Sequence, residues 1–364
     1  MKRILLKFYL DVNLGDDVMI AMLLRRFPEH QFFIYTKSTL NYGIFEQYPN
    51  LFLLRRGYLK ELCGKTKYDA YLVLGGSVLD YNRWIGLLYQ IKEIILCVCA
   101  RIKGVKTMVI GANTTQFPDR WYAFLYRFVF FLRIRLLHLI TVRDRFSYRR
   151  ISKYGEGKTH CFPDIVFGYG GQKDAGTDGP AHAPSGQVLG ISVFFHSGSS
   201  RREASVYRPF AQAADLFLAR GGEKVLLTAF DTGRSNDSYA VLQVYRMIAE
   251  KDRVELVFYN GDIAAFLQKL HTCSRFICVR FHALVLALMA QIPFMPVIYA
   301  NKCRNLLDDL GYTGPAPNLL DLPAADPAQL LRMDPFLLGD EALKEAAEKS
   351  RGHFDVLEAY LNGL

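Results

Sequence analysis

The chain has 364 residues, of which 51% are hydrophobic and 22% charged, a composition that excludes an intrinsically disordered protein. Its formal net charge of +10 favours an anionic partner such as a phosphate ester, a lipid head group or nucleic acid, without choosing among them. The length predicts about two domains of ordinary size, and two domains imply a cleft between them.

In the first half, short apolar runs alternate with segments of helical period, which is typical of βαβ units around a parallel sheet. The first run reaches a turn too early for a signal peptide and predicts a strand. Strands are predicted at 2–9, 31–35, 68–74, 106–111, 139–142 and 159–162, and helices starting near Asp16, Trp84, Arg120 and Asp144. Arginines interrupt the most apolar stretch, Trp121 to Ile140, so we expect no transmembrane helix.

A segment rich in Gly, Pro and Ala, residues 168–186, interrupts this alternation and is predicted to be a linker. Beyond it, strands are predicted at 187–193, 223–229, 254–258, 275–279 and 294–299. We therefore expect an α/β fold in which two Rossmann-like domains, residues 1–167 and 187–335, face each other across a cleft. Residues 336–364 form an amphipathic helix that could pack on either domain.

The seven cysteines are odd in number, lie mostly in apolar runs and form no C-x-x-C pair, which indicates buried thiols in a reducing compartment. We therefore expect a cytoplasmic protein without a metal site. No Ser-His-Asp order, H-E-x-x-H or Walker sequence is present, so hydrolase, zinc-protease and NTPase functions have no motif support.

The first candidate site segment, Asn13 to Asp17, follows the first predicted strand. Gly15 would let the backbone approach a ligand closely. Asp16 is either the N-cap of the next helix or a base that faces the cleft. The segment lacks the G-x-G-x-x-G pattern, so it gives no support for a dinucleotide site.

Two further segments follow strands of the first half. The turn Gly75, Gly76 and Ser77 either exposes amide groups to an anion or sugar or is a simple strand-to-loop turn. Arg143 comes directly after the strand at 139–142, and the next residue, Asp144, is predicted to cap a helix.

The strongest pattern is a basic cluster in the second half. Arg280 and His282 follow one predicted strand and Lys302 follows the next, so the shared edge of the sheet should bring them together. Arginine binds carboxylate or phosphate with two hydrogen bonds, lysine adds a point charge, and histidine exchanges protons near neutral pH. Arg143 follows its strand as Arg280 does, so one arginine from each domain could close on one anion.

The chain contains, in this order, Asn13-x-Gly15-Asp16, Gly75-Gly76-Ser77, Val142-Arg143-Asp144, Asp164, Arg280-x-His282-Ala283, Ala287, Pro293 and Tyr299-x-x-Lys302. This ordered set resembles the polysaccharide pyruvyl transferase family. The resemblance implies a fold similar to the GT-B glycosyltransferases, with residues 1–167 as the acceptor side and residues 187–335 as the donor side, and transfer of a pyruvate ketal from phosphoenolpyruvate to a sugar. The donor-binding residues of the family would be Arg143, Arg280, His282 and Lys302. Phe194-Phe195-His196, where a basic residue is expected, and Ser77, in place of a third glycine, depart from the pattern.

Phosphoenolpyruvate carries a carboxylate and a phosphate, and two arginines and a lysine can neutralise their negative charge. His282 is the predicted proton donor or phosphate ligand, and Asp16 the predicted base for a sugar hydroxyl. We expect no cofactor beyond the donor substrate, no divalent metal and no nucleic acid. Family acceptors are often sugars on lipid diphosphates, which makes a polyprenyl-diphosphate-linked sugar the expected acceptor.

Two other functions stay open: a nucleotide-sugar-dependent GT-B glycosyltransferase, and a non-catalytic relative that binds an anionic glycan. Residues 120–135 combine seven aromatic residues with four arginines. This segment is either a core or dimer-interface helix, or a surface that lies peripherally on the inner face of the cytoplasmic membrane, with Arg133 and Arg135 near the lipid.

Overall fold

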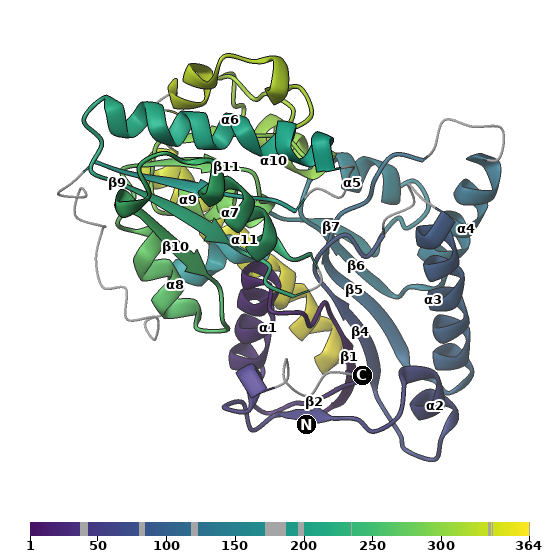
Figure 1. The fold of residues 1–364 in the computed structure, drawn as a ribbon. Helices are drawn as coiled ribbons and strands as arrows, with labels where there is room; N and C mark the ends of the chain where they lie inside the picture. The colour runs from purple at the N-terminus through teal and green to yellow at the C-terminus, as the bar shows by residue number, and fades with distance from the viewer. Residues whose placement is uncertain are drawn as a thin grey trace. The chain divides into compact units, whose positions relative to one another are not determined.

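The computed structural model describes residues 1–36, 43–79, 84–117, 123–171, 187–195, 200–233, 235–333, 336 and 338–363. By its internal contacts the chain divides into two compact units. The first unit comprises Met1–Leu10, Val18–Tyr169 and Ala346–Leu364, and the second comprises Asp11–Asp17 and Gly170–Glu345. Each unit is built on one parallel sheet with helices packed against it (Figure 1).

The sheet of the first unit has the strand order β3-β2-β1-β4-β5-β6-β7. Its strands are β1 (Arg3–Lys7), β2 (Gln31–Ile34), β3 (Leu51–Leu53), β4 (Ala70–Leu74), β5 (Lys106–Ala112), β6 (Leu139–Val142) and β7 (Thr159–Cys161). Every residue of the central strand β4 is buried, as expected for a parallel sheet covered on both faces. The register places Leu5 of β1 beside Tyr71 of β4.

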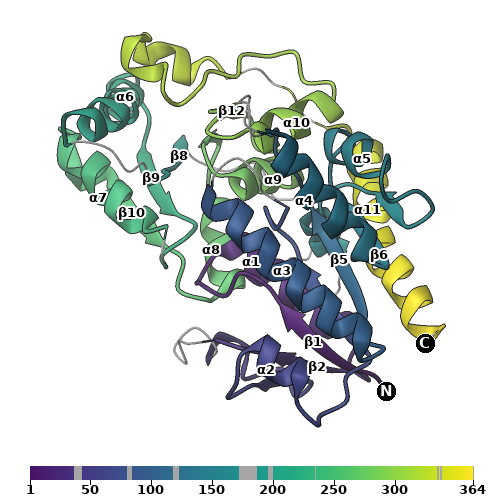
Figure 2. The same ribbon diagram turned by 90° about the vertical axis from the view of Figure 1, so that its right-hand side faces the viewer.

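Helices cover both faces of this sheet. They are α1 (Leu14–Arg26), α2 (Tyr58–Cys63), α3 (Trp84–Ile102), α4 (Ala123–Leu136), α5 (Arg145–Ile151) and α11 (Asp340–Asn362), with 3-10 turns η1 (Gly43–Phe45) and η2 (Ile165–Gly171). The helices α3 and α4 lie side by side (Figure 2). On the opposite face α11 packs on α1, where the Phe27 and Phe354 rings meet edge to face, 6.1 Å apart.

The sheet of the second unit has the order β10-β9-β8-β11-β12. Its strands are β8 (Val188–Ser192), β9 (Lys224–Ala229), β10 (Val254–Phe258), β11 (Arg275–Cys278) and β12 (Phe294–Pro296). Its helices are α6 (Ser200–Ala219), α7 (Asp237–Met247), α8 (Ile263–Leu270), α9 (Phe281–Met289) and α10 (Asn301–Asp309), with η3 (Lys251–Arg253), η4 (Leu322–Ala324) and η5 (Pro327–Leu331). One hydrophobic core joins α6 and α7 to the strands.

The predicted α/β class is confirmed, and each predicted strand is present. The sequence prediction did not include β3 or α2. The segment 11–17, which we assigned to the first domain, groups with the second unit because Leu14 N donates to Phe230 O (3.0 Å). The last helix returns to the first unit from Ala346 onward.

Some predictions fall outside the described residues, namely most of the linker (172–186), the start of the helix near Arg120 (118–122) and His196. Arg133, expected near the lipid, is fully buried in α4 and donates to Glu93 Oε2 of α3 (3.0 Å), so that placement is wrong. Among the described helices, none is long and apolar enough to cross a membrane.

Candidate functional site

The carboxyl ends of the strands in the second sheet carry most of the predicted site residues. The strand order changes direction between β8 and β11, and open parallel sheets bind ligands outside the strand ends at such a point. Phe194 follows β8, Asp231 follows β9, Arg280 follows β11, and Tyr299 and Lys302 follow β12. The prediction that Arg280, His282 and Lys302 lie at one edge of one sheet is therefore met by the topology.

A buried aspartate holds the guanidinium of Arg280. Its Nε and Nη2 donate to the two carboxylate oxygens of Asp237, at 2.7 and 2.5 Å. Burial raises the pKa of Asp237, and the adjacent guanidinium opposes that rise. Burial likewise acts to lower the pKa of Arg280, but Asp237 raises it overall, so the guanidinium stays protonated. Within the described part of the chain, Nη1 makes no hydrogen bond, which leaves one edge of the fork for an anion.

An aromatic pair separates the two cations of this edge. The Arg280 Cζ lies 4.7 Å from the centroid of the Phe194 ring, and that ring lies 4.4 Å from the Tyr299 ring. On the other side, Lys302 Nζ lies 5.2 Å from the Tyr299 centroid and 5.7 Å from the Phe281 centroid. Ring faces attract cations, so the aromatic side chains favour two positive charges near each other. Lys302 has no ion pair among the described residues.

His282 lies in the first turn of α9, against Gly15 in the first turn of α1. A Cβ atom built on Gly15 would lie 1.7 Å from His282 Nδ1, inside the imidazole ring. Glycine at position 15 is therefore required by this contact. The His282 ring also meets the Phe281 ring edge to face, at 5.1 Å. The imidazole is thus confined between Gly15 and Phe281.

The segment 11–17 is anchored by its asparagine. Asn13 Oδ1 accepts from the backbone amides of Gly15 (3.1 Å) and Asp16 (3.4 Å), and Asn13 Nδ2 donates to Asp231 Oδ2 (3.0 Å). Because α1 begins at Leu14, Asn13 is the capping residue and the capping alternative for Asp16 is wrong. The role of Asp16 as a base stays a prediction.

The neighbouring carboxyl group, Asp17, has a strongly altered environment. It is fully buried, and Tyr259 Oη donates to its Oδ2 at 2.9 Å. Burial raises the pKa of Asp17 to about 8; the Tyr259 hydrogen bond acts against this rise, and Asp16 and Asp231 add to it. Asp17 therefore carries a proton near neutral pH.

The first-unit candidates lie at the strand ends of their own sheet. Arg143 has a side chain only 2% exposed; its Nη1 donates to Asp164 (2.9 Å) and its Nη2 to Asn113 (2.6 Å). Its donor role stays a prediction. Asp144 caps α5 by accepting from Ser147 N at 2.7 Å, so the capping prediction is confirmed.

The turn at 75–77 is also committed to its own sheet. Gly75 N donates to Ile110 O of β5 at 2.7 Å. This amide is therefore bonded within the sheet, as expected for a strand-to-loop turn. Gly75 and Gly76 have φ values of 67° and 64°, the left-handed region that favours glycine. Ser77 is exposed at the end of the turn.

Sequence reasoning missed the residues that hold the cluster in place. Asp237 carried no recognised pattern, although a carboxylate in the first turn of a helix after a strand is a feature that could have drawn attention to it. Phe194 was noted only as a departure, yet it lies under the guanidinium. Within the described ranges, no group of three His, Cys, Asp or Glu side chains is placed to hold a metal ion.

Comparison with known families shows the family to which the chain belongs. The family model of polysaccharide pyruvyl transferase matches residues 13–301. The chain belongs to the polysaccharide pyruvyl transferase family. The match includes Arg143, Arg280 and His282 and ends one residue before Lys302. A search of curated proteins found no match.

Several solved structures share the fold at low sequence identity. UDP-GlcNAc 2-epimerase from Neisseria meningitidis, bound to UDP-GlcNAc, has a TM-score of 0.63 at 10% identity over 100% of both chains. The Methanocaldococcus jannaschii UDP-GlcNAc 2-epimerase has 0.61 at 9%, over 99% of this chain and 100% of its own. Anabaena HepE in complex with UDP and glucose has 0.55 at 13%, over 100% of both chains. The predicted GT-B type of fold is therefore confirmed.

Proposed function

We propose that the protein transfers a pyruvate ketal from phosphoenolpyruvate to two hydroxyl groups of a sugar in a polysaccharide precursor. Membership in the pyruvyl transferase family supports a transferase. The observation that carries the donor is the pair Arg280 and Lys302, two cations bridged by Phe194 and Tyr299 at the ligand edge of one sheet.

The donor has two anionic groups, and the edge offers two cations of different kinds. Arg280 is protonated and oriented by Asp237, so its Nη1 edge can meet a carboxylate or phosphate oxygen without reorganisation. Lys302 adds a point charge in the first turn of α10. The N-termini of α9 and α10 bring further partial positive charge to this edge.

The reaction requires a proton for the methylene carbon of the donor, attack by two sugar hydroxyl groups at the adjacent carbon and departure of phosphate. The two hydroxyl groups release two protons; one balances the proton added to carbon and the other leaves with phosphate. His282, confined between Gly15 and Phe281, is the proposed proton donor or phosphate ligand. Asp16 is the proposed base for a hydroxyl group.

Titration of the full-length protein with phosphoenolpyruvate, followed by thermal shift and calorimetry, tests the donor. We expect phosphoenolpyruvate to stabilise the protein, whereas Arg280→Lys and Lys302→Ala weaken its binding by about tenfold or more, the scale of one charge-assisted hydrogen bond. Arg246→Ala on the exposed surface of α7 is the matched control. Unchanged affinity in both site variants would contradict the assignment.

Parallel titrations separate the other two functions. Stabilisation by UDP- or GDP-sugars, without any effect of phosphoenolpyruvate, would favour a nucleotide-sugar glycosyltransferase. Binding of an anionic glycan without turnover of any donor would favour a non-catalytic relative. We expect turnover to persist in EDTA because Arg280 and Lys302 neutralise the donor themselves; loss restored by magnesium or manganese would favour the glycosyltransferase.

The proposed acceptor is a sugar linked to a polyprenyl diphosphate, and the proposed location is the cytoplasm, at the inner face of the cytoplasmic membrane. A lipid-linked acceptor requires the protein to reach the bilayer, and the net charge of +10 would attract it to anionic lipids. Product analysis with lipid-linked and free sugars tests this acceptor.

A further inference from the structure

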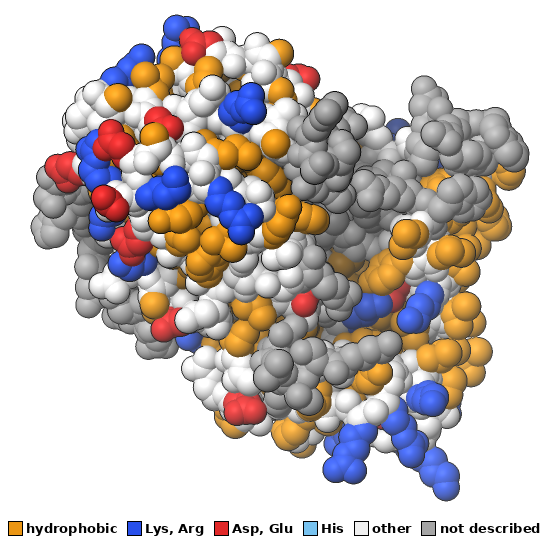
Figure 3. Space-filling view, in the orientation of Figure 1, with side chains coloured by type: hydrophobic (Ala, Val, Ile, Leu, Met, Phe, Trp, Pro, Cys, Tyr) orange, Lys and Arg blue, Asp and Glu red, His pale blue; other side chains and the backbone are white. Residues whose placement is uncertain are grey.

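Two adjacent helices of the first unit expose continuous apolar stripes. On α3 the exposed side chains recur every three or four residues: Ile85, Leu88, Ile91, Ile95, Val98 and Ile102. On α4 they are Phe124, Phe128 and Phe131. These are nine of the nineteen large hydrophobic residues exposed in the described part of the chain, so they form a patch and not a scatter. Figure 3 shows apolar side chains along the edge where Figure 1 places these helices.

The charge on this surface, which we call the α3–α4 face, has one sign. The one acidic residue of α3, Glu93, is fully buried, where it pairs with Arg133 and Lys7, and α4 has no acidic residue. The exposed charged residues of the two helices are all basic: Lys92, Arg101, Arg127 and Arg135. A face of apolar and basic side chains, with no exposed acidic side chain on either helix, complements a surface that is anionic and partly apolar.

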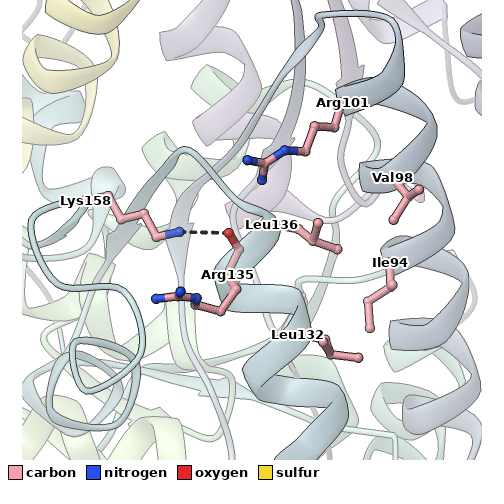
Figure 4. A pocket seen from close by; sticks show the side chains of 7 residues that line it. All are labelled: Ile94, Val98, Arg101, Leu132, Arg135, Leu136 and Lys158. Carbon is pink, nitrogen blue, oxygen red and sulfur yellow. Dashed lines mark hydrogen bonds between the residues drawn. The ribbon is translucent and has the colours of Figure 1, made fainter.

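A hollow of about 440 Å³ lies between the C-terminal halves of the two helices (Figure 4). Arg101 and Arg135 border it beside Lys158, with Val98 and Leu132 among its apolar lining. Neither arginine has an ion pair within the described residues. Lys158 Nζ donates to three backbone carbonyl groups at the end of α4, those of Ile134 (2.8 Å), Arg135 (3.2 Å) and Leu137 (2.6 Å), so the ammonium group is held there and contributes its charge to the hollow. Burial lowers the pKa of Lys158, and the charges of Arg135 and Arg101 lower it further.

We propose that the α3–α4 face docks on an anionic lipid bilayer, with its apolar stripes among the head groups and a lipid phosphate in the Arg101–Arg135–Lys158 hollow. A phosphate would relieve the mutual repulsion of these cations. The docking itself is argued from the α3–α4 face alone. Its benefit rests on the proposed function, because docking would bring the enzyme to a lipid-linked acceptor.

A second copy of the chain fits this face less well than a bilayer does. In a two-fold symmetric dimer the same patch of both subunits would meet, so each Arg101 and Arg135 would approach basic residues without any acidic partner from α3 or α4. A bilayer containing anionic lipid has no such cost, because each basic residue near its surface contributes about 1 kcal/mol.

Flotation of the full-length protein with phosphatidylcholine vesicles, alone or mixed with phosphatidylglycerol, tests the docking. We expect binding to the mixed vesicles at low salt and release at high salt. Arg101→Glu with Arg135→Glu should lower the partition coefficient about tenfold or more, since two charges are reversed. Leu88→Ser with Ile95→Ser should also lower it, because apolar burial is lost. The control Leu242→Ser with Arg246→Glu, exposed on α7, should bind like the wild type.

Wild-type protein that stays unbound with phosphatidylglycerol vesicles at low salt, or a glutamate variant that binds like the wild type, would overturn the proposal. A wild-type dimer in sedimentation that Leu88→Ser with Ile95→Ser makes monomeric, without vesicle binding, would instead assign the face to a second copy. Phosphoenolpyruvate titration of the same variants should match the wild type. If the wild type does not bind phosphoenolpyruvate, the proposed donor is contradicted, whereas the vesicle result still tests the docking of the α3–α4 face.

Discussion

Two arginines follow buried parallel strands in the same way, one in each unit, yet their surroundings differ. Arg143, after β6, is 2% exposed in its side chain and bonded to Asp164 and Asn113. Arg280, after β11, is 11% exposed, and Asp237 binds only one side of its guanidinium. Position after a strand therefore brings an arginine to the ligand edge, while the neighbouring residues decide whether it can bind a ligand.

The glycines of the two regions are required for different reasons. Gly75 and Gly76 in the first unit have positive φ values, so glycine satisfies the backbone there. Gly15 in the second unit is required by its neighbour, since a methyl group would enter the His282 ring. A glycine required by the side chain of a predicted catalytic residue is stronger evidence of a site than one required by a turn.

The largest effect is expected when the buried ion pair of Arg143 and Asp164 in the first unit is broken. Arg143→Met leaves Asp164 buried without its cation, which should lower the free energy of unfolding by about 3–5 kcal/mol. Denaturant unfolding measures this loss, and Arg149→Met, exposed on α5, is the control. A variant of wild-type stability that binds phosphoenolpyruvate tenfold more weakly would show instead that Arg143 is a donor ligand, as the family resemblance implies.

The next effect concerns Gly15 and the predicted proton donor. Gly15→Ala must displace His282 or the first turn of α1, because its Cβ would lie 1.7 Å from Nδ1. Displacing a reacting group by about 1 Å can cost on the order of a hundredfold in rate. We expect kcat/KM to fall by that order, while Gly339→Ala, which has open space around it, leaves kcat/KM unchanged. Full activity in Gly15→Ala would remove His282 from its proposed role.

A pH effect distinguishes the buried carboxyl group of the second unit. The pKa of Asp17 is raised to about 8 from 3.8, so between these values the folded state binds a proton that the unfolded state has lost. Stability from this group is therefore fully present below pH 3.8 and decreases as the pH rises toward 8, by up to about 1.4 kcal/mol per pH unit.

Asp17→Asn keeps the shape of the side chain without the ionisation. The difference in unfolding free energy between wild type and this variant should therefore fall steadily from pH 4 to pH 8 and then level off. Asp252→Asn, at an exposed position, is the control. A difference that stays constant over this interval would mean that Asp17 is ionised in the folded protein.

The sequence predicted what local pattern determines. Short apolar runs predicted the strands, and the order of the strands placed Arg280 and Lys302 at one edge of the sheet. The three-residue strand β3 was missed because Leu51–Leu53 is short and two of its residues are exposed. An amphipathic pattern does not name its partner, so the return of the last helix to the first unit could not be predicted.

Long-range pairing explains the other misses. Asp237 holds Arg280 from 43 residues away, and no spacing along the chain connects them. Arg133 was placed near lipid because its segment is rich in arginine and aromatic residues, but its partner Glu93 lies 40 residues away on another helix. Charge pairs between separate elements decide such residues, and composition alone does not describe those pairs.

The smallest predicted effect concerns the aromatic ring that supports Arg280. Phe194→Leu keeps an apolar side chain but removes the ring that lies 4.7 Å from the guanidinium and 4.4 Å from the Tyr299 ring. A cation–π contact at a partly buried site contributes about 1 kcal/mol, so phosphoenolpyruvate should bind roughly fivefold more weakly. Phe195→Leu is the matched control, because its ring packs on Tyr239 and its backbone amide can still donate to Asp237. Calorimetric titration measures both variants. Equal donor affinity in Phe194→Leu and Phe195→Leu would mean that Asp237 alone orients Arg280 and that the aromatic pair contributes only to packing.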